Sequence, residues 1–291
     1  MAIAPNPISR RSIVFGFLGI GIATVLHACD RTKASDEASG EGAENGKAGD
    51  EDLLLKVGLN VGNVPWQYED EQGNFVGFEV DLVKLIAARL ERPIEFVELL
   101  FTELFPAVLS GRVDLAISSI TITEERMATV DFAQPYYDSD QSLTVLAGSA
   151  IRSLEGMRGK VVAVSSATTG DAWVQEHMEE YGFIDIMRYE SITAAMMELK
   201  AGKYDGYISD FPSQWYYANN HPEVVVVQRI PTEEQYSMMF AKGEPLRDEV
   251  NALITQLKES GQIAEIHRRW FDEAPDPNTS TVQVADIPTL R

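Results

Sequence analysis

Apolar residues between Leu53 and about Phe271 occur in two patterns: short continuous runs, and longer stretches with an apolar residue at every third or fourth position. The short runs are typical of buried strands, and the longer stretches are typical of helices that pack on a sheet by one face. The two patterns alternate over roughly 220 residues, which is enough for two modest α/β cores. Strands are predicted at 53–59, 94–97, 113–117, 160–165, 184–188 and 204–209.

Helices are predicted between these strands, and two more are predicted to close the fold. Thr102 is a candidate N-cap, and Gly111 and Gly202 each follow a helix end, where glycine is favoured. Strands that alternate with helices predict parallel sheets, in which ligands bind beyond the carboxyl ends of the strands. The predicted helices span 79–90, 102–110, 168–181, 191–201, 246–258 and 262–270.

An internal similarity relates the two halves of this region. The run from Gly111 to Ser119 resembles the later run from Gly202 to Asp210, because each has a glycine, a basic residue, a strand and a polar exit in that order. Two similar halves with polar residues at equivalent strand ends predict two lobes that face one cleft.

The chain is predicted to cross between these lobes twice. The segments 142–146 and 235–241 have the extended pattern of crossovers, so the closing helices return to the first lobe. Two antiparallel connections of this kind form a natural hinge. We therefore expect an α/β fold of two lobes with parallel-rich sheets. The expected boundaries are 53–144 with 234–273 for lobe 1, 145–233 for lobe 2, and 274–291 for a tail poor in core residues.

The first 28 residues have the pattern of a bacterial export signal, with Arg10 and Arg11 before an apolar run that continues to Leu26. The paired arginines resemble a twin-arginine signal, and an ordinary Sec signal is the alternative. The segment ending at Cys29 resembles a lipobox, so Cys29 is predicted to carry lipid. Residues 29–52 contain no aromatic residue and are rich in Asp, Glu, Gly, Ala and Ser, which predicts a disordered tether.

Charge and cysteine content exclude several classes of function. The net charge of −21 disfavours nucleic acid and anionic lipid as partners. A single cysteine excludes an internal disulfide. The sequence has no His or Cys cluster with metal-ligand spacing and no nucleophile elbow, so we expect no metal, no cofactor and no catalytic residue. His177 and His267 are expected at the surface.

The strand ends offer groups that suit a free amino acid. A buried carboxylate needs a guanidinium or backbone N–H donors, and a buried ammonium needs a carboxylate. Arg126 follows Thr123, which can cap a short helix and let the guanidinium reach back to the strand exit. Asp210 lies at the equivalent exit of the second half, where it either binds an ammonium or caps the following helix.

Two further groups extend this candidate site. Thr168 and Thr169 begin a helix directly after a strand, and the free amides of such a helix bind carboxylates. Phe101 follows the second strand and Trp66 follows a proline, so either aromatic side chain could form a wall of the cleft or belong to the core.

Residues 53–272 resemble the family of bacterial periplasmic solute-binding proteins for polar amino acids. The resemblance implies a type II periplasmic-binding-protein fold and a receptor that serves an ABC importer. The stretches that carry it are 76–82, 118–126, 130–132 with 135–137, 168–170 and 208–210, and they occur in the order typical of the family.

The resemblance also implies roles for individual residues. Arg126 would clamp the ligand carboxylate, with donors added by Thr169. Asp210 would bind the ammonium, helped by Ser119 and Thr121, and Phe101 would lie along the ligand. The complete set of expected ligand-binding residues is Asn60, Trp66, Phe101, Ser118, Ser119, Thr121, Arg126, Thr168, Thr169 and Asp210.

Two positions depart from the family pattern. After the first strand the family often has an aspartate and, three residues later, an aromatic residue, whereas this chain has Asn60 and Asn63. The missing carboxylate weakens the case for a lysine- or arginine-type ligand, and we expect Trp66 to replace the missing ring in part. The backbone clamp is therefore better supported than the side-chain pocket.

We accordingly expect a monomeric extracytoplasmic lipoprotein, on the periplasmic or cell-surface side, that binds a free amino acid and delivers it to the permease of an ABC importer. The first alternative is an exported cyclohexadienyl dehydratase acting on prephenate or arogenate, which resembles the same fold and would need a general acid in the cleft. The second alternative is a sensory input domain, which is disfavoured because no transmembrane helix or signalling region follows.

Overall fold

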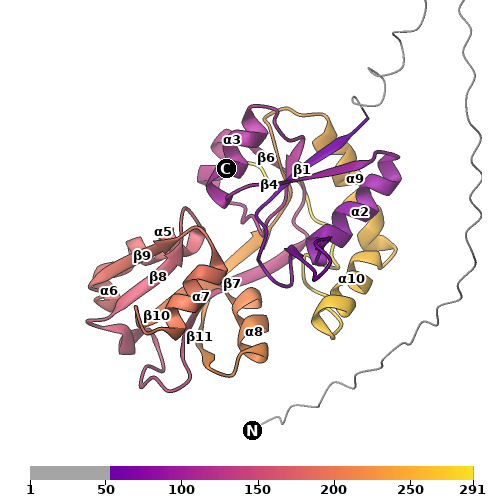
Figure 1. The fold of residues 1–291 in the computed structure, drawn as a ribbon. Helices are drawn as coiled ribbons and strands as arrows, with labels where there is room; N and C mark the ends of the chain where they lie inside the picture. The colour runs from indigo at the N-terminus through magenta and orange to yellow at the C-terminus, as the bar shows by residue number, and fades with distance from the viewer. Residues whose placement is uncertain (1–52, 291) are drawn as a thin grey trace, which may run out of the picture. The chain divides into compact units, whose positions relative to one another are not determined.

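The computed structural model describes residues 53–290. The predicted export signal, the lipidation site Cys29 and the predicted tether lie outside the described residues. Residues 53–290 form two α/β lobes, each built around one five-stranded sheet (Figure 1). This architecture confirms the fold class predicted from the alternation of strand and helix patterns.

The sheet of the first lobe has the strand order β4-β1-β5-β12-β6. Its first three strands are parallel, and β12 runs antiparallel to both β5 and β6 because it belongs to the returning chain. A separate pair of short strands, β2 and β3, precedes the first helix. The strands are β1 (Leu55–Leu59), β2 (Tyr68–Glu69), β3 (Phe75–Val76), β4 (Ile94–Glu98), β5 (Leu115–Ala116), β6 (Asp131–Phe132) and β12 (Met239–Phe240); the helices are α2 (Phe78–Leu90), α3 (Phe101–Leu109), α4 (Glu124–Thr129), α9 (Leu246–Glu259) and α10 (Gln262–Phe271).

The sheet of the second lobe has the order β11-β7-β10-β8-β9. Here β9, β8 and β10 are parallel, and β7 is antiparallel to β10 and β11. The strands are β7 (Tyr137–Leu146), β8 (Val161–Ser165), β9 (Asp185–Tyr189), β10 (Gly206–Asp210) and β11 (Val224–Tyr236); the helices are η1 (Leu154–Met157), α5 (Thr169–Glu176), α6 (Met178–Tyr181), α7 (Ile192–Lys200) and α8 (Phe211–Asn220).

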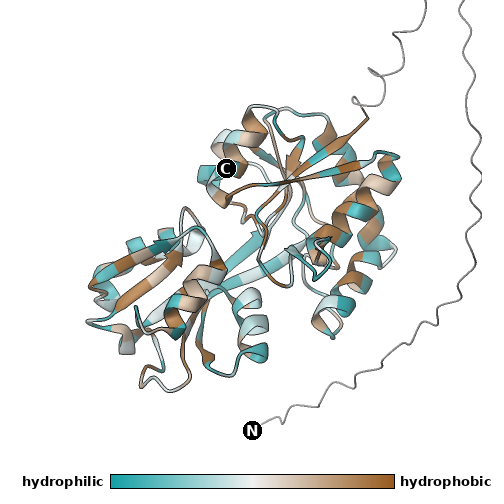
Figure 2. Cartoon of the chain, viewed as in Figure 1, coloured by the Kyte–Doolittle hydropathy of each residue, from teal (hydrophilic) through white to brown (hydrophobic). Residues whose placement is uncertain are grey.

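Each lobe has its own apolar core, and Figure 2 shows hydrophobic residues gathered on the central strands, with hydrophilic residues on the outer faces of the helices. Phe78 and Phe240 are fully buried in the first lobe, and Val162 and Tyr207 are fully buried in the second. The central parallel strands β1 and β8 are mostly buried, which explains their apolar runs, whereas the edge strands β4 and β9 are partly exposed. None of the helices within 53–290 combines the length and apolar character needed to cross a membrane.

The long strands β7 and β11 connect the lobes. They pair with each other from the Leu146–Val224 end to Tyr137 and Tyr236. Beyond these two tyrosines the chain enters the first lobe, where the N–H of Ser237 donates to the carbonyl of Ile120. The crossover expected at 142–146 thus belongs to the longer strand β7, whereas the one expected at 235–241 includes the end of β11 and the short strand β12. The expected lobe boundaries after 144 and 233 fall inside β7 and β11, respectively.

Several predicted element ends were wrong for local reasons. The helix expected from Thr102 begins at Phe101, because the Glu103 carboxylate accepts the N–H of Leu100 and moves the N-cap to that residue. The helix expected to continue to 181 is divided at His177, which separates α5 from α6. The strands predicted at 113–117 and 204–209 are observed as the shorter β5 and β10, because only the residues that pair with a neighbouring strand belong to the sheet.

The C-terminal segment packs on the first lobe and on the hinge strands. Ser280 and Thr281 are buried, and the Ser280 hydroxyl donates to the carboxylate of Asp138 on β7. The Nζ of Lys258, on α9, donates to the carbonyl of Gln283 at 2.9 Å and to that of Pro135 at 2.6 Å. The segment has few core residues, as expected, and is held mainly by polar contacts.

Candidate functional site

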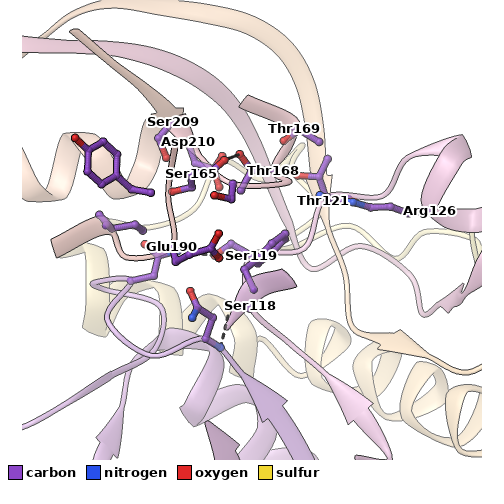
Figure 3. A pocket seen from close by; sticks show the side chains of 16 residues that line it. Ser118, Ser119, Thr121, Arg126, Ser165, Thr168, Thr169, Glu190, Ser209 and Asp210 are labelled. Atoms are coloured by element: carbon purple, nitrogen blue, oxygen red, sulfur yellow. Dashed lines mark hydrogen bonds between the residues drawn. The ribbon is translucent and has the colours of Figure 1, made fainter. Parts of the chain in front are cut away.

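A cavity between the two lobes collects most of the polar strand exits (Figure 3). In the first lobe its lining residues follow β1, β4 and β5, and in the second lobe they end or follow β8, β9 and β10. This is the edge at which parallel sheets bind ligands. The residues that line the cavity are Asn60, Asn63, Phe101, Ser118, Ser119, Thr121, Arg126, Ser165, Ser166, Thr168, Thr169, Tyr189, Glu190, Ile192, Ser209 and Asp210.

Arg126 is the cation of this cavity. It lies on α4, whose N-cap is Thr123: the Thr123 hydroxyl accepts the Arg126 backbone N–H at 3.1 Å. The guanidinium donates to the carbonyl of Thr121 at 2.8 Å and, across the cleft, to that of Ala167 at 3.4 Å. It lies 5.5 Å from the ring centre of Phe101, a cation–π distance. Burial lowers the pKa of Arg126, and nearby Glu234 opposes that shift.

Asp210 occupies the N-cap position of α8, but its side chain does not cap the helix. Its carboxylate instead accepts hydrogen bonds from the hydroxyl of Tyr236 at 2.6 Å and from Nε2 of Gln141 at 2.8 Å. Burial raises the pKa of Asp210, and the neighbouring carboxylate of Glu234 raises it further. Of the two roles expected for Asp210, a group held in the cleft matches the geometry, and the helix cap does not.

Glu234, on β11, is a buried acid that the sequence analysis missed. One carboxylate oxygen accepts from the hydroxyl of Thr121 at 2.8 Å and from that of Thr169 at 3.1 Å. The other accepts from Nε2 of Gln141 at 2.9 Å. Glu234 and Tyr236 are two residues apart on one strand, so their side chains are on the same face, where they contact the lining residues Thr121 and Asp210. The alternation of side chains along the strand was the signal in the sequence that could have located Glu234. It was missed because the polar run Glu233-Glu234-Gln235 is typical of a solvent-exposed segment.

The serine pair after β5 is held by a buried acid on α2. Ser119 has φ of 49°, in the left-handed region, and its N–H donates to Oε1 of Glu79 at 2.7 Å. The same oxygen accepts from the hydroxyl of Tyr136, while the other oxygen has no partner among the described residues. Burial raises the pKa of Glu79 to about 7. The Ser118 hydroxyl accepts from Nε2 of Gln67 at 2.8 Å.

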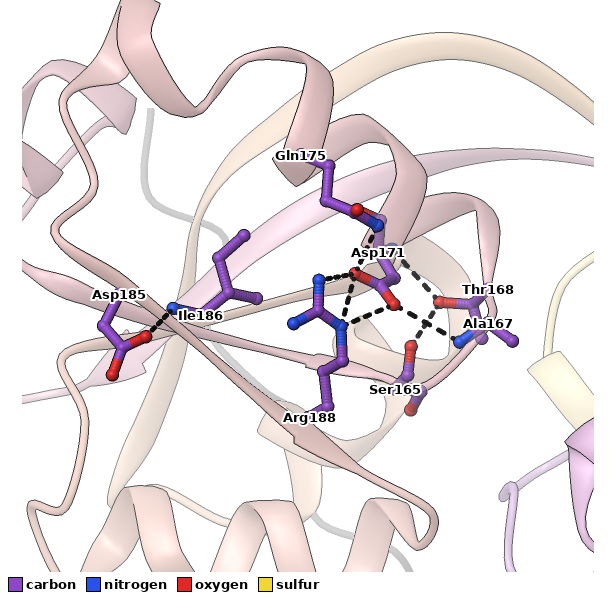
Figure 4. A network of polar contacts seen from close by, with 8 residues as sticks. All are labelled: Ser165, Ala167, Thr168, Asp171, Gln175, Asp185, Ile186 and Arg188. Carbon is purple, nitrogen blue, oxygen red and sulfur yellow. Dashed lines mark hydrogen bonds and ion pairs between the residues drawn. The ribbon is translucent and has the colours of Figure 1, made fainter.

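The loop between β8 and α5 is braced from within its own lobe (Figure 4). Asp171 is 5% exposed and accepts Nε of Arg188 at 2.9 Å. Asp171 also accepts Nε2 of Gln175 at 3.0 Å, and its own N–H donates to the Thr168 hydroxyl at 3.3 Å. Ala167, just before, has φ of 58°. The first N–H groups of α5, which have no intrahelical acceptors, are thereby fixed at the cavity.

Nine of the ten expected ligand-binding residues line the cavity, and Trp66 does not. Its ring is fully buried in the first lobe, at 4.6 Å from the ring of Tyr137, and its Nε1 donates to the hydroxyl of Ser213 on α8 at 2.9 Å. A large ring with one donor is stabilised most by full burial with that donor paired. Trp66 therefore does not replace the aromatic residue that is missing at Asn63.

The lining also contains residues that were not expected. These residues lie at or next to the carboxyl ends of β8, β9 and β10, so the rule that had selected Asp210 could also have selected them. Among residues 53–290 there is no group of three or more His, Cys, Asp or Glu side chains placed to hold a metal ion. The additional lining residues of the second lobe are Ser165, Ser166, Tyr189, Glu190, Ile192 and Ser209.

Known proteins similar to this chain are binding proteins. The arginine-binding extracellular protein ArtP of Bacillus subtilis is 30% identical over 237 residues, which cover 80% of this chain and 90% of that protein. The ABC transporter glutamine-binding protein GlnH of the same organism is 29% identical over 260 residues, which cover 86% of this chain and 93% of that protein. Neither name describes an enzyme, so these relatives do not support the dehydratase alternative.

A solved structure agrees with these relatives. A mutant of the protein ArgBP from T. maritima is 35% identical and superposes with a TM-score of 0.72, covering 77% of this chain and 97% of that one. Residues 55–273 match the family described as bacterial extracellular solute-binding proteins, family 3. That match includes both lobes and every residue that lines the cavity. The chain belongs to family 3 of the bacterial extracellular solute-binding proteins.

Proposed function

We propose that this protein binds a polar amino acid in the cavity between its lobes and delivers it to an ABC importer. The observation that carries the proposal is that Arg126 and Asp210 line one cavity from opposite lobes. A guanidinium and a carboxylate are the partners that the carboxylate and ammonium of an amino acid need when both are taken out of water. The names of the similar binding proteins support the same class of ligand.

The carboxylate of the ligand is assigned to the end of the cavity that contains Arg126. The first N–H groups of α5, at Thr169 and Gly170, point their dipoles at an anion there. The ammonium is assigned to Asp210, whose carboxylate is already oriented by Tyr236 and Gln141. Both charges of the ligand backbone then have a partner of opposite sign.

The remaining lining favours a ligand side chain that donates hydrogen bonds. Oδ1 of Asn63 is buried and has no partner among the described residues. Glu190 adds a carboxylate at the same cavity, where it contacts the Thr102 hydroxyl across the cleft at 3.4 Å. Both are acceptors. A guanidinium, imidazole, ammonium or amide side chain supplies the matching donors, and Glu190 offsets part of the charge lost at Asn60.

We also propose an extracytoplasmic position for the folded part, with Cys29 as the site of a lipid anchor. The support is the export signal and the lipobox-like segment, together with the extracellular relative ArtP. Cys29→Ser tests the anchor, because the wild type should fractionate with membranes and the variant should be released or stay unprocessed. Equal solubility of the two forms would contradict lipidation. The twin-arginine route is tested by replacing Arg10 and Arg11 with lysine.

A thermal-shift screen of the twenty amino acids tests ligand binding. A ligand at a hundredfold its dissociation constant should add about 2.7 kcal/mol to the free energy of unfolding. We expect the largest shifts from amino acids with donor side chains. A screen in which none of the twenty raises the melting temperature would overturn the proposed function. Incubation with prephenate and arogenate belongs in the same experiment, and we expect no turnover of either compound.

A further inference from the structure

The carboxylate of Glu234 joins the two lobes beside the ligand cavity, where it bonds the lining residues Thr121 and Thr169. Its side chain comes from β11, one of the strands that connect the lobes, and the residue is 7% exposed. One oxygen accepts hydrogen bonds from Thr121, on the first lobe, and from Thr169, on the second. A single oxygen thus bonds hydroxyls from both walls of the cleft.

This contact fixes the direction of both hydroxyl protons. A hydroxyl has one proton to donate and two lone pairs. Because Thr121 and Thr169 each donate to Glu234, they present only lone pairs to other partners. Thr169 also accepts from Nε2 of Gln141 at 3.3 Å. The Thr169 hydroxyl is therefore not a donor to a ligand carboxylate. The donors expected at this position come from the backbone N–H groups instead.

The same carboxylate is linked to the ammonium partner. Nε2 of Gln141 donates to Oδ1 of Asp210 at 2.8 Å and to Glu234 at 2.9 Å. Gln141 therefore holds two carboxylates close to each other at one end of the cavity. A cationic group of a ligand that binds there meets Asp210, the lone pairs of Thr121 and the field of Glu234.

We propose that Glu234 is a positioning residue of the ligand site, which turns the Thr121 and Thr169 hydroxyls into acceptors, orients Asp210 through Gln141, and ties the closed lobes together. The inference rests on the proposed function, because it concerns how the same cavity receives an ammonium. Part of the affinity for the ligand then depends on Glu234, which lies on a connecting strand and not at a strand exit.

The charge of Glu234 should affect the number of protons that are released when the ligand binds. The charged or titratable groups that face Glu234 are Asp210, Arg126 and Tyr236, and Glu79 lies next to them. Glu234 raises the pKa of Asp210, whereas Arg126 lowers it. Binding of an ammonium requires ionised Asp210, so binding near neutral pH should release protons to the buffer. Removal of the charge at residue 234 takes away one of the causes that raise the pKa of Asp210, after burial itself, so this pKa should fall and fewer protons should be released.

Glu234→Gln tests the role, and Glu233→Gln is its matched control, because it removes the same charge from the adjacent, exposed residue. In the orientation that keeps an oxygen toward Gln141, the NH₂ group of a glutamine donates to the Thr121 and Thr169 hydroxyls, which then turn their protons away from residue 234 and toward the ligand. Glu234→Gln therefore reverses both hydroxyls as well as removing the charge. Calorimetry in buffers of different ionisation enthalpy gives both the dissociation constant and the number of protons released. The ligand is the amino acid that gives the largest thermal shift.

We expect Glu234→Gln to bind about 10- to 100-fold more weakly than the wild type, and to release fewer protons at pH 7. We expect Glu233→Gln to match the wild type in both measurements. Glu234→Asp keeps the charge but withdraws it from the threonines, so its affinity should fall while proton release is retained. If Glu234→Gln does not fold, Glu234→Asp decides the question by its affinity: a dissociation constant equal to that of Glu233→Gln would overturn the role of Glu234.

The outcomes separate this inference from the function on which it rests. A wild type that binds none of the amino acids overturns the proposed function. A wild type that binds, with Glu234→Gln equal to Glu233→Gln in affinity and in proton release, overturns the role of Glu234 and leaves the function intact. Weaker binding with unchanged proton release also overturns it, because a loss of general packing would give that result.

Discussion

Glu79 should make the stability of this protein fall as the pH rises. Its carboxyl is fully buried beneath the serine pair of the ligand cavity, and burial raises its pKa from 4.5 to about 7. A group whose pKa is higher in the folded state stabilises the fold below its unfolded pKa, and this stabilisation is lost as the pH rises through the folded pKa. The loss from Glu79 therefore falls between pH 4.5 and about pH 7.

The size of this loss of stability follows from the shift in the pKa of Glu79. Each pKa unit corresponds to about 1.4 kcal/mol, so the cost of ionising Glu79 in the folded state approaches about 3 kcal/mol. Glu79→Gln has the shape of the neutral acid, and its carbonyl oxygen can still accept from Tyr136 and from the N–H of Ser119. The variant should equal the wild type at pH 4 and be more stable by about 3 kcal/mol at pH 8.

Urea unfolding of the two proteins at several pH values between 4 and 8 measures this difference directly. Glu95→Gln is the control, because it removes the same charge from an exposed residue of β4 and should leave the curve unchanged. Lys258 and His267 are present in all three proteins, so their contributions cancel; His267 was expected at the surface, but it is buried. Asp210 raises the pKa of Glu79, so the difference between wild type and variant includes that interaction. A difference that stays constant across the pH range, or a variant that is less stable than the wild type at pH 8, would refute the reasoning.

Three further changes test the site and its surroundings. Arg126→Ala should remove the charged partner of the ligand carboxylate, leave it only the N–H groups of α5, and weaken binding by about 2–5 kcal/mol without unfolding the protein; calorimetry that shows undiminished binding would contradict the clamp. Asn60→Asp should shift preference toward arginine over glutamine, measured by competition, and an unchanged ratio would exclude Asn60 from the side-chain pocket. Deletion of 274–291 should lower the free energy of unfolding by about 1–3 kcal/mol, because Lys258 loses the carbonyl of Gln283; an unchanged urea midpoint would show that the segment contributes nothing.

Local pattern was sufficient for the strands and for most of the cavity. The exits of β1, β5 and β10 could be located because the carboxyl ends of parallel strands meet at one edge, whichever order the strands take. Arg126 and Asp210 were found in this way. Glu190 follows from the same rule, and it was missed because the apolar run that predicted β9 ended two residues before it.

Contacts between distant segments could not be derived from the pattern. Trp66 and Glu234 show this in opposite directions: the aromatic residue expected to bind the ligand is in the core, and an acidic residue that was not predicted at the site is buried next to it. Each assignment depends on a partner far away in the sequence, Ser213 for Trp66 and Thr121 for Glu234. Hydrophobicity alone assigns a tryptophan to either place and a glutamate to the surface.

The burial of Trp66 gives the molecule an intrinsic optical probe. The emission of an indole shifts to longer wavelength when water relaxes around its excited state. Trp66 is fully buried in the first lobe, while its N–H donates to Ser213 at the start of a helix of the second. Separation of the lobes breaks that bond and admits water, whereas Trp215, which is 53% exposed, is solvated throughout. Fluorescence of the unlabelled protein therefore reports the closing of the lobes, and Ser213→Ala identifies the part of the signal that comes from Trp66.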